Sequence, residues 1–174
     1  MTFEKHIYLI GFMGAGKSTV AKALSKRTGL PVVEMDEELV RRAGMSINEI
    51  FAAKGEGTFR QMESALLSET AAGGPAIVSC GGGLVKDENN VKTMRQSGTV
   101  IFLTATPETI LSRVLGDHSR PLLEGKHDIA SIAEMIAERA PLYERAADQK
   151  TPVDGKTPDA IADEILVDLK EENC

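Results

Sequence analysis

The segment Gly11-Phe12-Met13-Gly14-Ala15-Gly16-Lys17-Ser18 (residues 11–18) decides the fold expected for this chain. It matches the phosphate-binding pattern G-x-x-x-x-G-K-[ST], in which glycines let the backbone wrap around phosphate oxygens. Successive N–H groups and the N-terminus of the following helix attract the anion. Lys17 is expected to reach the β- and γ-phosphates, and the Ser18 hydroxyl to hold Mg²⁺. A chance glycine turn is disfavoured because an apolar run at 7–10 precedes the segment and helix-favouring residues 17–28 follow it.

Short apolar runs alternate with helix-favouring stretches along the rest of the chain. The strands are predicted at 7–10, 31–36, 76–80, 99–103 and 152–154. The helices are predicted at 17–28, 37–43, 46–53, 58–72, 87–96, from Thr106-Pro107 onward, 129–147 and 158–170. This alternation predicts an α/β protein with helices on both faces of a parallel sheet. A single domain spanning residues 1–174 is expected.

Composition excludes several classes of protein. The chain has 174 residues and a net charge of −6, and this acidic balance argues against a nucleic-acid partner. Its two cysteines, Cys80 and Cys174, predict no disulfide framework and fit a reducing, cytoplasmic compartment. No run of apolar residues is long enough to span a membrane. The apolar run at 7–10 passes straight into a glycine turn, so no signal peptide is expected.

The phosphate-binding segment alone does not name a reaction. The sequence contains no N-K-x-D motif for guanine recognition, and no long apolar run ending in Asp-Glu such as transport or motor ATPases carry. A chain of 174 residues also leaves no room for a large mechanical apparatus. Phosphoryl transfer to a small molecule is therefore the favoured interpretation.

Candidate acceptor residues follow the predicted strands, where ligands bind in open α/β sheets. Asp36 could accept the proton of an attacking hydroxyl. Glu34, two residues earlier, is expected to share the Asp36 side of an extended strand and to support Mg²⁺ through a water. The alternative is a solvated acidic cluster at a helix start. Arg60 is interpreted either as a surface arginine or as the partner of Glu63.

A larger set of residues resembles the shikimate kinase family. The matching stretches, in chain order, are Gly11-x-x-Gly14-x-Gly16-Lys17-Ser18-Thr19, Glu34-x-Asp36, Ser46-Ile47-x-x-Ile50-Phe51, Gly55-Glu56-x-x-Phe59-Arg60-x-x-Glu63, Gly81-Gly82-Gly83, Arg120-Pro121-Leu122-Leu123 and Arg139-x-Pro141-Leu142-Tyr143. They cover nearly the whole chain. Related gluconate and nucleoside monophosphate kinases share the phosphate cradle but not Phe59-Arg60-x-x-Glu63 with the triple glycine.

The resemblance implies transfer of the γ-phosphoryl group of MgATP to the 3-hydroxyl of shikimate, in aromatic amino acid biosynthesis. It implies a three-layer α/β/α fold with a short, mainly five-stranded parallel sheet and a mobile lid at about 116–128. The acceptor-binding region would lie at about 34–63, and the enzyme is expected to be a monomer with one Mg²⁺.

The resemblance also assigns residues to roles. The catalytic residues would be Lys17, Asp36 and Arg120. The ATP-binding residues would be Gly14, Ala15, Gly16, Lys17, Ser18, Thr19, Arg113 and Arg120. The shikimate-binding residues would be Asp36, Arg60, Gly81, Gly82, Gly83 and Arg139, and the metal-binding residues would be Ser18 and, through a water, Glu34. Glu63 would orient Arg60.

Two positions depart from the family pattern. The family usually has Asp-x-Asp where this chain has Glu34-x-Asp36, so the water network around Mg²⁺ is expected to shift. The adenine loop at Asp154–Pro158 looks short, with Lys156 where the family often has arginine, which could loosen nucleotide preference. The alternatives left open are a kinase of another hydroxylated acceptor, such as gluconate or a nucleoside monophosphate, and a non-catalytic nucleotide-binding module.

Overall fold

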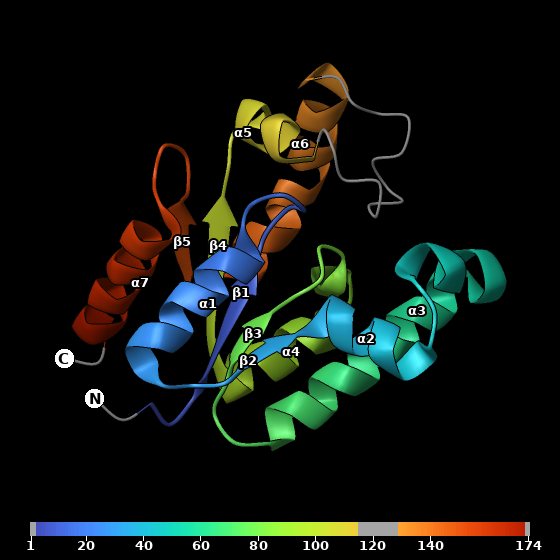
Figure 1. Cartoon of the computed structure of the whole chain (residues 1–174), viewed down its shortest axis with the longest axis horizontal. Coiled ribbons are helices and arrows are strands. Elements are labelled where there is room, and N and C mark those ends of the chain that lie inside the picture. The colour runs from blue at the N-terminus through green and yellow to red at the C-terminus, as the bar shows by residue number, and fades with distance from the viewer. Residues whose placement is uncertain (1–2, 115–128, 173–174) are drawn as a thin grey trace.

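The computed structural model describes residues 3–114 and 129–172. These residues form a five-stranded parallel sheet with the strand order β2-β3-β1-β4-β5 (Figure 1). The strands are β1 (His6–Ile10), β2 (Val32–Glu34), β3 (Ile77–Ser79), β4 (Gly98–Thr104) and β5 (Gln149–Pro152). The α/β prediction with a five-stranded parallel sheet is confirmed.

Helices cover both faces of this sheet. They are α1 (Lys17–Thr28), α2 (Met35–Ala43), α3 (Ile47–Ala72), α4 (Glu88–Ser97), α5 (Pro107–Val114), α6 (Ile129–Ala146) and α7 (Pro158–Glu172), with a short 3-10 turn, η1 (Leu84–Lys86). Helices α1 and α7 pack together on one face, whereas α3 packs on α4 on the other (Figure 1). Right-handed crossovers place α1 on the face opposite α3 and α4. None of the helices in the described ranges is long and apolar enough to cross a membrane.

The central strand β1 is buried along its whole length, as is usual for a parallel sheet with both faces covered. Its polar first residue, His6, is only 4 % exposed and accepts a hydrogen bond from the Ala76 amide through Nδ1 at 3.1 Å. Cys80, just beyond β3, is also buried, and burial raises the pKa of its thiol. This environment fits the prediction that Cys80 acts as a small apolar side chain rather than a nucleophile.

Local sequence signals set most helix ends. Gly16 and Gly29 flank α1 with left-handed backbone angles, and they give the helix the predicted bounds. Ser46 caps α3 by accepting from the Glu49 amide at 3.1 Å, as its sequence pattern indicates. The two helices predicted at 46–53 and 58–72 form one element interrupted at Gly55, where φ is 81° and ψ is 164°.

Two predicted strand boundaries are wrong. The second strand ends at Glu34, and Met35 already begins α2. Met35 is fully buried and the next three residues are acidic, which suits the positive end of a helix dipole. The last strand occupies 149–152 instead of 152–154. It is a polar edge strand, so its sequence carries no apolar run to mark its start.

Candidate active site

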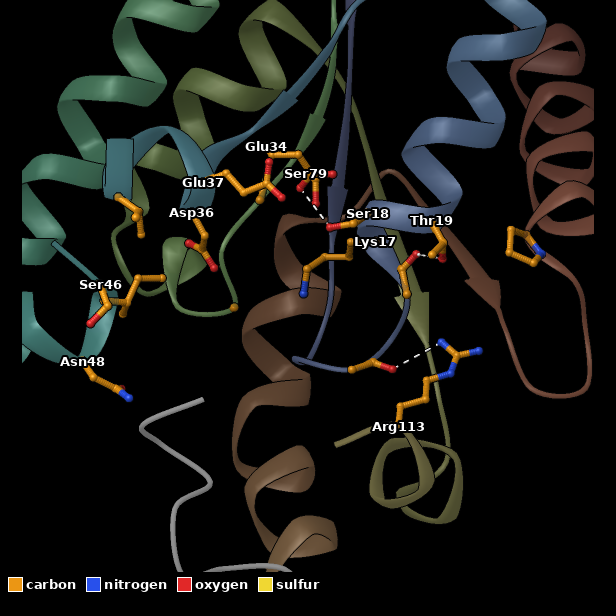
Figure 2. Close-up of a pocket in the computed structure, with 17 residues that line it drawn as sticks. Lys17, Ser18, Thr19, Glu34, Asp36, Glu37, Ser46, Asn48, Ser79 and Arg113 are labelled. Carbon is orange, nitrogen blue, oxygen red and sulfur yellow. Dashed lines mark hydrogen bonds between the residues drawn. The ribbon is translucent and has the colours of Figure 1, made fainter. Parts of the chain in front are cut away.

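A cleft of about 820 Å³ opens at the carboxyl ends of β1, β2 and β3, where the chain leaves the sheet for α1, α2 and the triple glycine. Its lining residues are Gly14, Gly16, Lys17, Ser18, Thr19, Glu34, Asp36, Glu37, Val40, Ser46, Ile47, Asn48, Ser79, Cys80, Gly82, Arg113 and Pro158. Figure 2 shows Lys17 between Asp36 on one side and Arg113 on the other. The cleft therefore joins predicted nucleotide residues with Asp36 and Gly82 of the predicted acceptor residues.

The phosphate-binding loop wraps around the amino group of Lys17. Lys17 Nζ donates to the carbonyl oxygens of Gly11 at 2.7 Å and Phe12 at 3.2 Å, which holds the charge over the loop. Gly16 has a φ of 93°, and a Cβ there would lie 2.6 Å from Nη1 of Arg113. The left-handed φ disfavours any other residue at Gly16, and the N–H groups of the loop can approach an anion closely.

Arg113 approaches the same loop from the end of α5. It donates from Nη1 to the Gly14 carbonyl at 3.2 Å (Figure 2). It lines the cleft together with Pro158, the first residue of α7. Arg113 and the 154–158 segment thus sit on the side of Lys17 away from Asp36.

The Asp154 carboxylate fixes the base of that segment. Its Oδ1 accepts from the Thr106 amide at 2.9 Å and from the Thr109 hydroxyl at 2.7 Å. Desolvation acts to raise the pKa of Asp154, but these hydrogen bonds outweigh it and lower the pKa. The loop after β5 is therefore tied to the start of α5, which carries Arg113.

Ser18 and Glu34 form the candidate magnesium site of the cleft. The Ser18 hydroxyl donates to Oε2 of Glu34 at 2.9 Å, while Oε1 of Glu34 is buried without a hydrogen-bond partner. No group of three or more His, Cys, Asp or Glu residues within the described ranges could enclose a metal. Mg²⁺ keeps several waters and is often held by one carboxylate and substrate phosphates, so this pair fits it.

Asp36 does not share a strand face with Glu34, contrary to the sequence-based expectation. It lies in the first turn of α2. Both carboxylates nevertheless line the cleft, because Glu34 is the residue that caps this helix. The helical turn leaves Glu34 beside Ser18 and directs Asp36 toward the triple glycine.

Each glycine of the triple-glycine segment approaches a different polar group of the site. A Cβ on Gly81 would lie 2.7 Å from Oε2 of Glu63 and 2.9 Å from Oδ1 of Asp36. A Cβ on Gly83 would overlap the guanidinium group of Arg60. None of the three glycines has a positive φ, and at Gly81 and Gly83 it is the neighbouring side chains that leave no room for a Cβ.

Gly82 faces the third group, on α6. A Cβ on it would lie 3.4 Å from Nη1 of Arg139 and 3.6 Å from the Tyr143 hydroxyl. Nη1 of Arg139 is buried and has no hydrogen-bond partner among the described residues. The guanidinium group lies over the Phe12 ring, 5.7 Å from its centroid. A buried cationic donor without an acceptor calls for an anionic ligand.

The carboxylates of Glu63 and Glu56 both accept hydrogen bonds from the Arg60 guanidinium group. Its Nη1 donates to Oε1 of Glu63 at 2.6 Å, and its Nη2 donates to Oε1 of Glu56 at 3.3 Å. Glu63 is only 1 % exposed, and desolvation raises its pKa although Arg60 opposes that shift. Of the two interpretations offered for Arg60, the ion pair with Glu63 is the one the structure shows.

Several predicted residues lie elsewhere or outside the described ranges. Arg60 and Gly83 line a neighbouring pocket of about 510 Å³ rather than the main cleft. Arg120 and the segment 116–128 fall outside the described residues. Sequence reasoning did not single out Glu37, Val40 or Asn48, which line the main cleft on the Asp36 side. It also missed the contact of Tyr143 with Gly82, although Tyr143 belongs to a motif already noted.

Comparisons with known proteins identify the family of this chain. The shikimate kinase family model matches residues 13–170. A shikimate kinase from Persephonella marina is 40 % identical over 162 residues, which are 93 % of this chain and 97 % of the relative. The structure of shikimate kinase from Acinetobacter baumannii in complex with shikimate superposes with a TM-score of 0.92 at 30 % identity, covering 97 % of this chain and 94 % of that one. The shikimate kinase from Aquifex aeolicus gives a TM-score of 0.83 at 37 % identity, covering 97 % and 98 %.

Proposed function

The chain belongs to the shikimate kinase family, and from that premise we propose how the described cleft carries out the family's reaction. The activity is the ATP-dependent phosphorylation of shikimate in aromatic biosynthesis, with MgATP as the phosphoryl donor. In our proposal the acceptor is the 3-hydroxyl of shikimate. The observation that carries the proposal is the buried Nη1 of Arg139, which lies beside Gly82 and has no hydrogen-bond partner among the described residues. A carboxylate of the acceptor would supply that partner.

The donor side of the cleft binds the nucleotide. The N–H groups of the loop Gly14, Ala15 and Gly16, with Ser18 and Thr19 at the start of α1, receive the phosphates. Lys17 exchanges its carbonyl contacts for the β- and γ-phosphates. Arg113 borders the loop and covers the adenine. This arrangement aims the γ-phosphate at the Asp36 side of the cleft.

Ser18 and Glu34 hold the magnesium ion, Ser18 through its hydroxyl and Glu34 through a bound water. When bound, Mg²⁺ neutralises negative charge on the β- and γ-phosphates. The buried, unpartnered Oε1 of Glu34 supports this role, because a carboxylate oxygen in that position needs a water or a cation.

The acceptor side orients a carboxylated, hydroxylated ring. Arg60 and Arg139 form hydrogen bonds with its carboxylate, since planar guanidinium groups match carboxylate geometry. Gly81, Gly82 and Gly83 let the backbone approach the ring. Asp36 accepts a hydrogen bond from the attacking hydroxyl and takes its proton as the phosphoryl group is transferred.

Further parts of the proposal concern the whole chain. Residues 1–174 act as one domain, with the acceptor region at 34–63 and a lid at 116–128, from which Arg120 stabilises the transferring phosphoryl group. The enzyme works as a monomer in the cytoplasm, without nucleic-acid or membrane partners. The net charge of −6 supports the exclusion of nucleic acid.

The direct test is ADP release by the purified protein with MgATP, in parallel with shikimate, gluconate or AMP. Stimulation by shikimate alone, with a product heavier by one phosphoryl group in mass spectrometry, is the expected result. Stimulation by gluconate or AMP instead would replace the proposed acceptor. Nucleotide binding with no stimulation by any of the three would reduce the chain to a nucleotide-binding module.

A further inference from the structure

Tyr143 contacts the triple-glycine segment from inside the protein. Its hydroxyl donates to the Gly82 carbonyl at 2.5 Å, and its side chain is almost fully buried at 2 % exposure. The two residues are 61 positions apart in the sequence. The contact therefore joins α6 to the loop that follows β3.

This contact fixes the orientation of one peptide group. In a trans peptide the carbonyl of Gly82 and the N–H of Gly83 point in opposite directions. The Tyr143 hydroxyl holds the carbonyl, so the Gly83 N–H is directed away from Tyr143. A peptide between two glycines has no Cβ on either side to restrict its rotation. The hydrogen bond with Tyr143 supplies that restriction.

Tyr143 is itself anchored at both ends. Its ring packs on the Phe102 ring of β4, with 5.1 Å between the centroids. Arg139 lies four residues earlier on α6, so both side chains project from one face of the helix. Pro141 between them has no N–H to continue the helix hydrogen bonds, which favours a local bend. Tyr143 and Arg139 thus reach Gly82 together.

We propose that Tyr143 is a positioning residue for the acceptor: it sets the Gly82–Gly83 peptide so that this backbone and Arg139 address the same bound shikimate. The inference rests on the proposed function. It concerns orientation alone, because the Tyr143 hydroxyl donates to the protein backbone on the acceptor side of the cleft. Loss of the hydroxyl should therefore weaken acceptor binding and leave the nucleotide side unchanged.

The chain provides a matched control for this idea. Its only other tyrosine, Tyr8, is also buried, and its hydroxyl bonds with Ser97 Oγ at 2.6 Å. Tyr143→Phe and Tyr8→Phe each remove one buried hydroxyl. We expect Tyr143→Phe to raise the KM for shikimate about tenfold, with the KM for ATP unchanged. Tyr8→Phe should change neither KM. Both variants should lower the thermal unfolding midpoint by similar amounts.

A shikimate KM that is unchanged in Tyr143→Phe, or raised equally in Tyr8→Phe, would overturn the inference. A wild-type protein that does not phosphorylate shikimate would instead overturn the proposed function. A second measurement needs no substitution at Tyr143. Fluorotyrosine incorporated into the Tyr8→Phe variant reports from Tyr143 alone, and its fluorine resonance should shift when shikimate is added. An unmoved resonance at saturating shikimate would contradict the positioning role.

Discussion

Arg60 holds its guanidinium group 2.6 Å from the carboxylate of Glu63, which is the most deeply buried acidic side chain of the described residues at 1 % exposure. The second oxygen of Glu63 is buried without a hydrogen-bond partner. Burial penalises the ionised form, and the arginine compensates for only part of that penalty. Burying the pair therefore lowers the stability of the fold, but it fixes the position of Arg60 at the acceptor site.

Comparing the pH dependence of stability in the wild type and in the Glu63→Gln variant should reveal this loss of stability. Desolvation raises the pKa of Glu63 above its ordinary value of 4.5, so the folded protein binds this proton more tightly than the unfolded chain. The stability that the proton contributes is complete below the unfolded pKa and is lost as pH rises through the folded pKa. The wild type should therefore lose stability relative to Glu63→Gln as pH rises above about 4.5, measured by urea unfolding at several pH values.

Glu134→Gln, at an exposed position on α6, serves as the control and should show no such trend. The prediction would be contradicted if the free energy of unfolding of the wild type rose relative to that of Glu63→Gln as pH increases. Glu63→Gln should also raise the KM for shikimate, since Arg60 loses its ionised partner.

Arg139→Lys tests the acceptor carboxylate contact. Lysine keeps the charge but loses the planar pair of donors, so we expect the KM for shikimate to rise about tenfold or more with little change in the KM for ATP. Arg145→Lys is the matched control on the same helix, because Arg145 is exposed and forms an ion pair with exposed Glu88 at 3.8 Å. Steady-state kinetics with each substrate varied in turn checks both variants. Equal shikimate KM values for Arg139→Lys and the wild type would remove Arg139 from the acceptor site.

Local signals in the sequence predict those parts of the fold that neighbouring residues determine. The ends of α1 follow from Gly16 and Gly29, and the cap of α3 follows from Ser46. The expected strand position of Asp36 is wrong because β-strand and helix signals overlap at 34–36, and burial of Met35 in the tertiary structure decides between them.

The contacts that assemble the site could not be read from local sequence. The bond from Tyr143 to Gly82 joins residues 61 positions apart, and packing of α6 on η1 and β4 brings them together. The reason for glycine at 81 and 83 is also tertiary, because it depends on which side chains crowd these two positions. The phosphate-binding loop is the exception, since its spacing alone implies its geometry.

Two glycines of α3 should respond oppositely to alanine. Gly57 is exposed and lies in helical conformation, and a Cβ added there would meet no neighbouring atom within 4 Å. Gly57→Ala should therefore raise the free energy of unfolding by about 0.5–1 kcal/mol. Gly55 has backbone angles that only glycine adopts readily, so Gly55→Ala should lower that free energy by about 1–3 kcal/mol. Urea denaturation measures both changes. A Gly55→Ala variant as stable as Gly57→Ala would show that the helix continues through this break.

The Ser18–Glu34 pair predicts a specific magnesium defect. Glu34→Gln removes the carboxylate charge beside Ser18, and we expect a several-fold rise in the Mg²⁺ concentration that gives half-maximal activity at fixed ATP. Addition of MgATP should raise the thermal unfolding midpoint of Glu34→Gln less than it raises that of the wild type. Glu37→Gln changes a neighbouring carboxylate of the cleft and is the control. If both variants need the same Mg²⁺ concentration, Glu34 does not serve the metal.

The strand order β2-β3-β1-β4-β5 places the two groups of site residues on opposite flanks of one central strand. Asp36 and the triple glycine follow β2 and β3, whereas Arg113 and Asp154 follow β4 and β5, with Lys17 between the two groups. A single synthetic compound that tethers a carboxylated ring to an adenosine phosphate across Lys17 would occupy both flanks at once. Its affinity would gain from the effective concentration of each half for its own flank, whereas a competitor of either substrate alone gains nothing from the other flank.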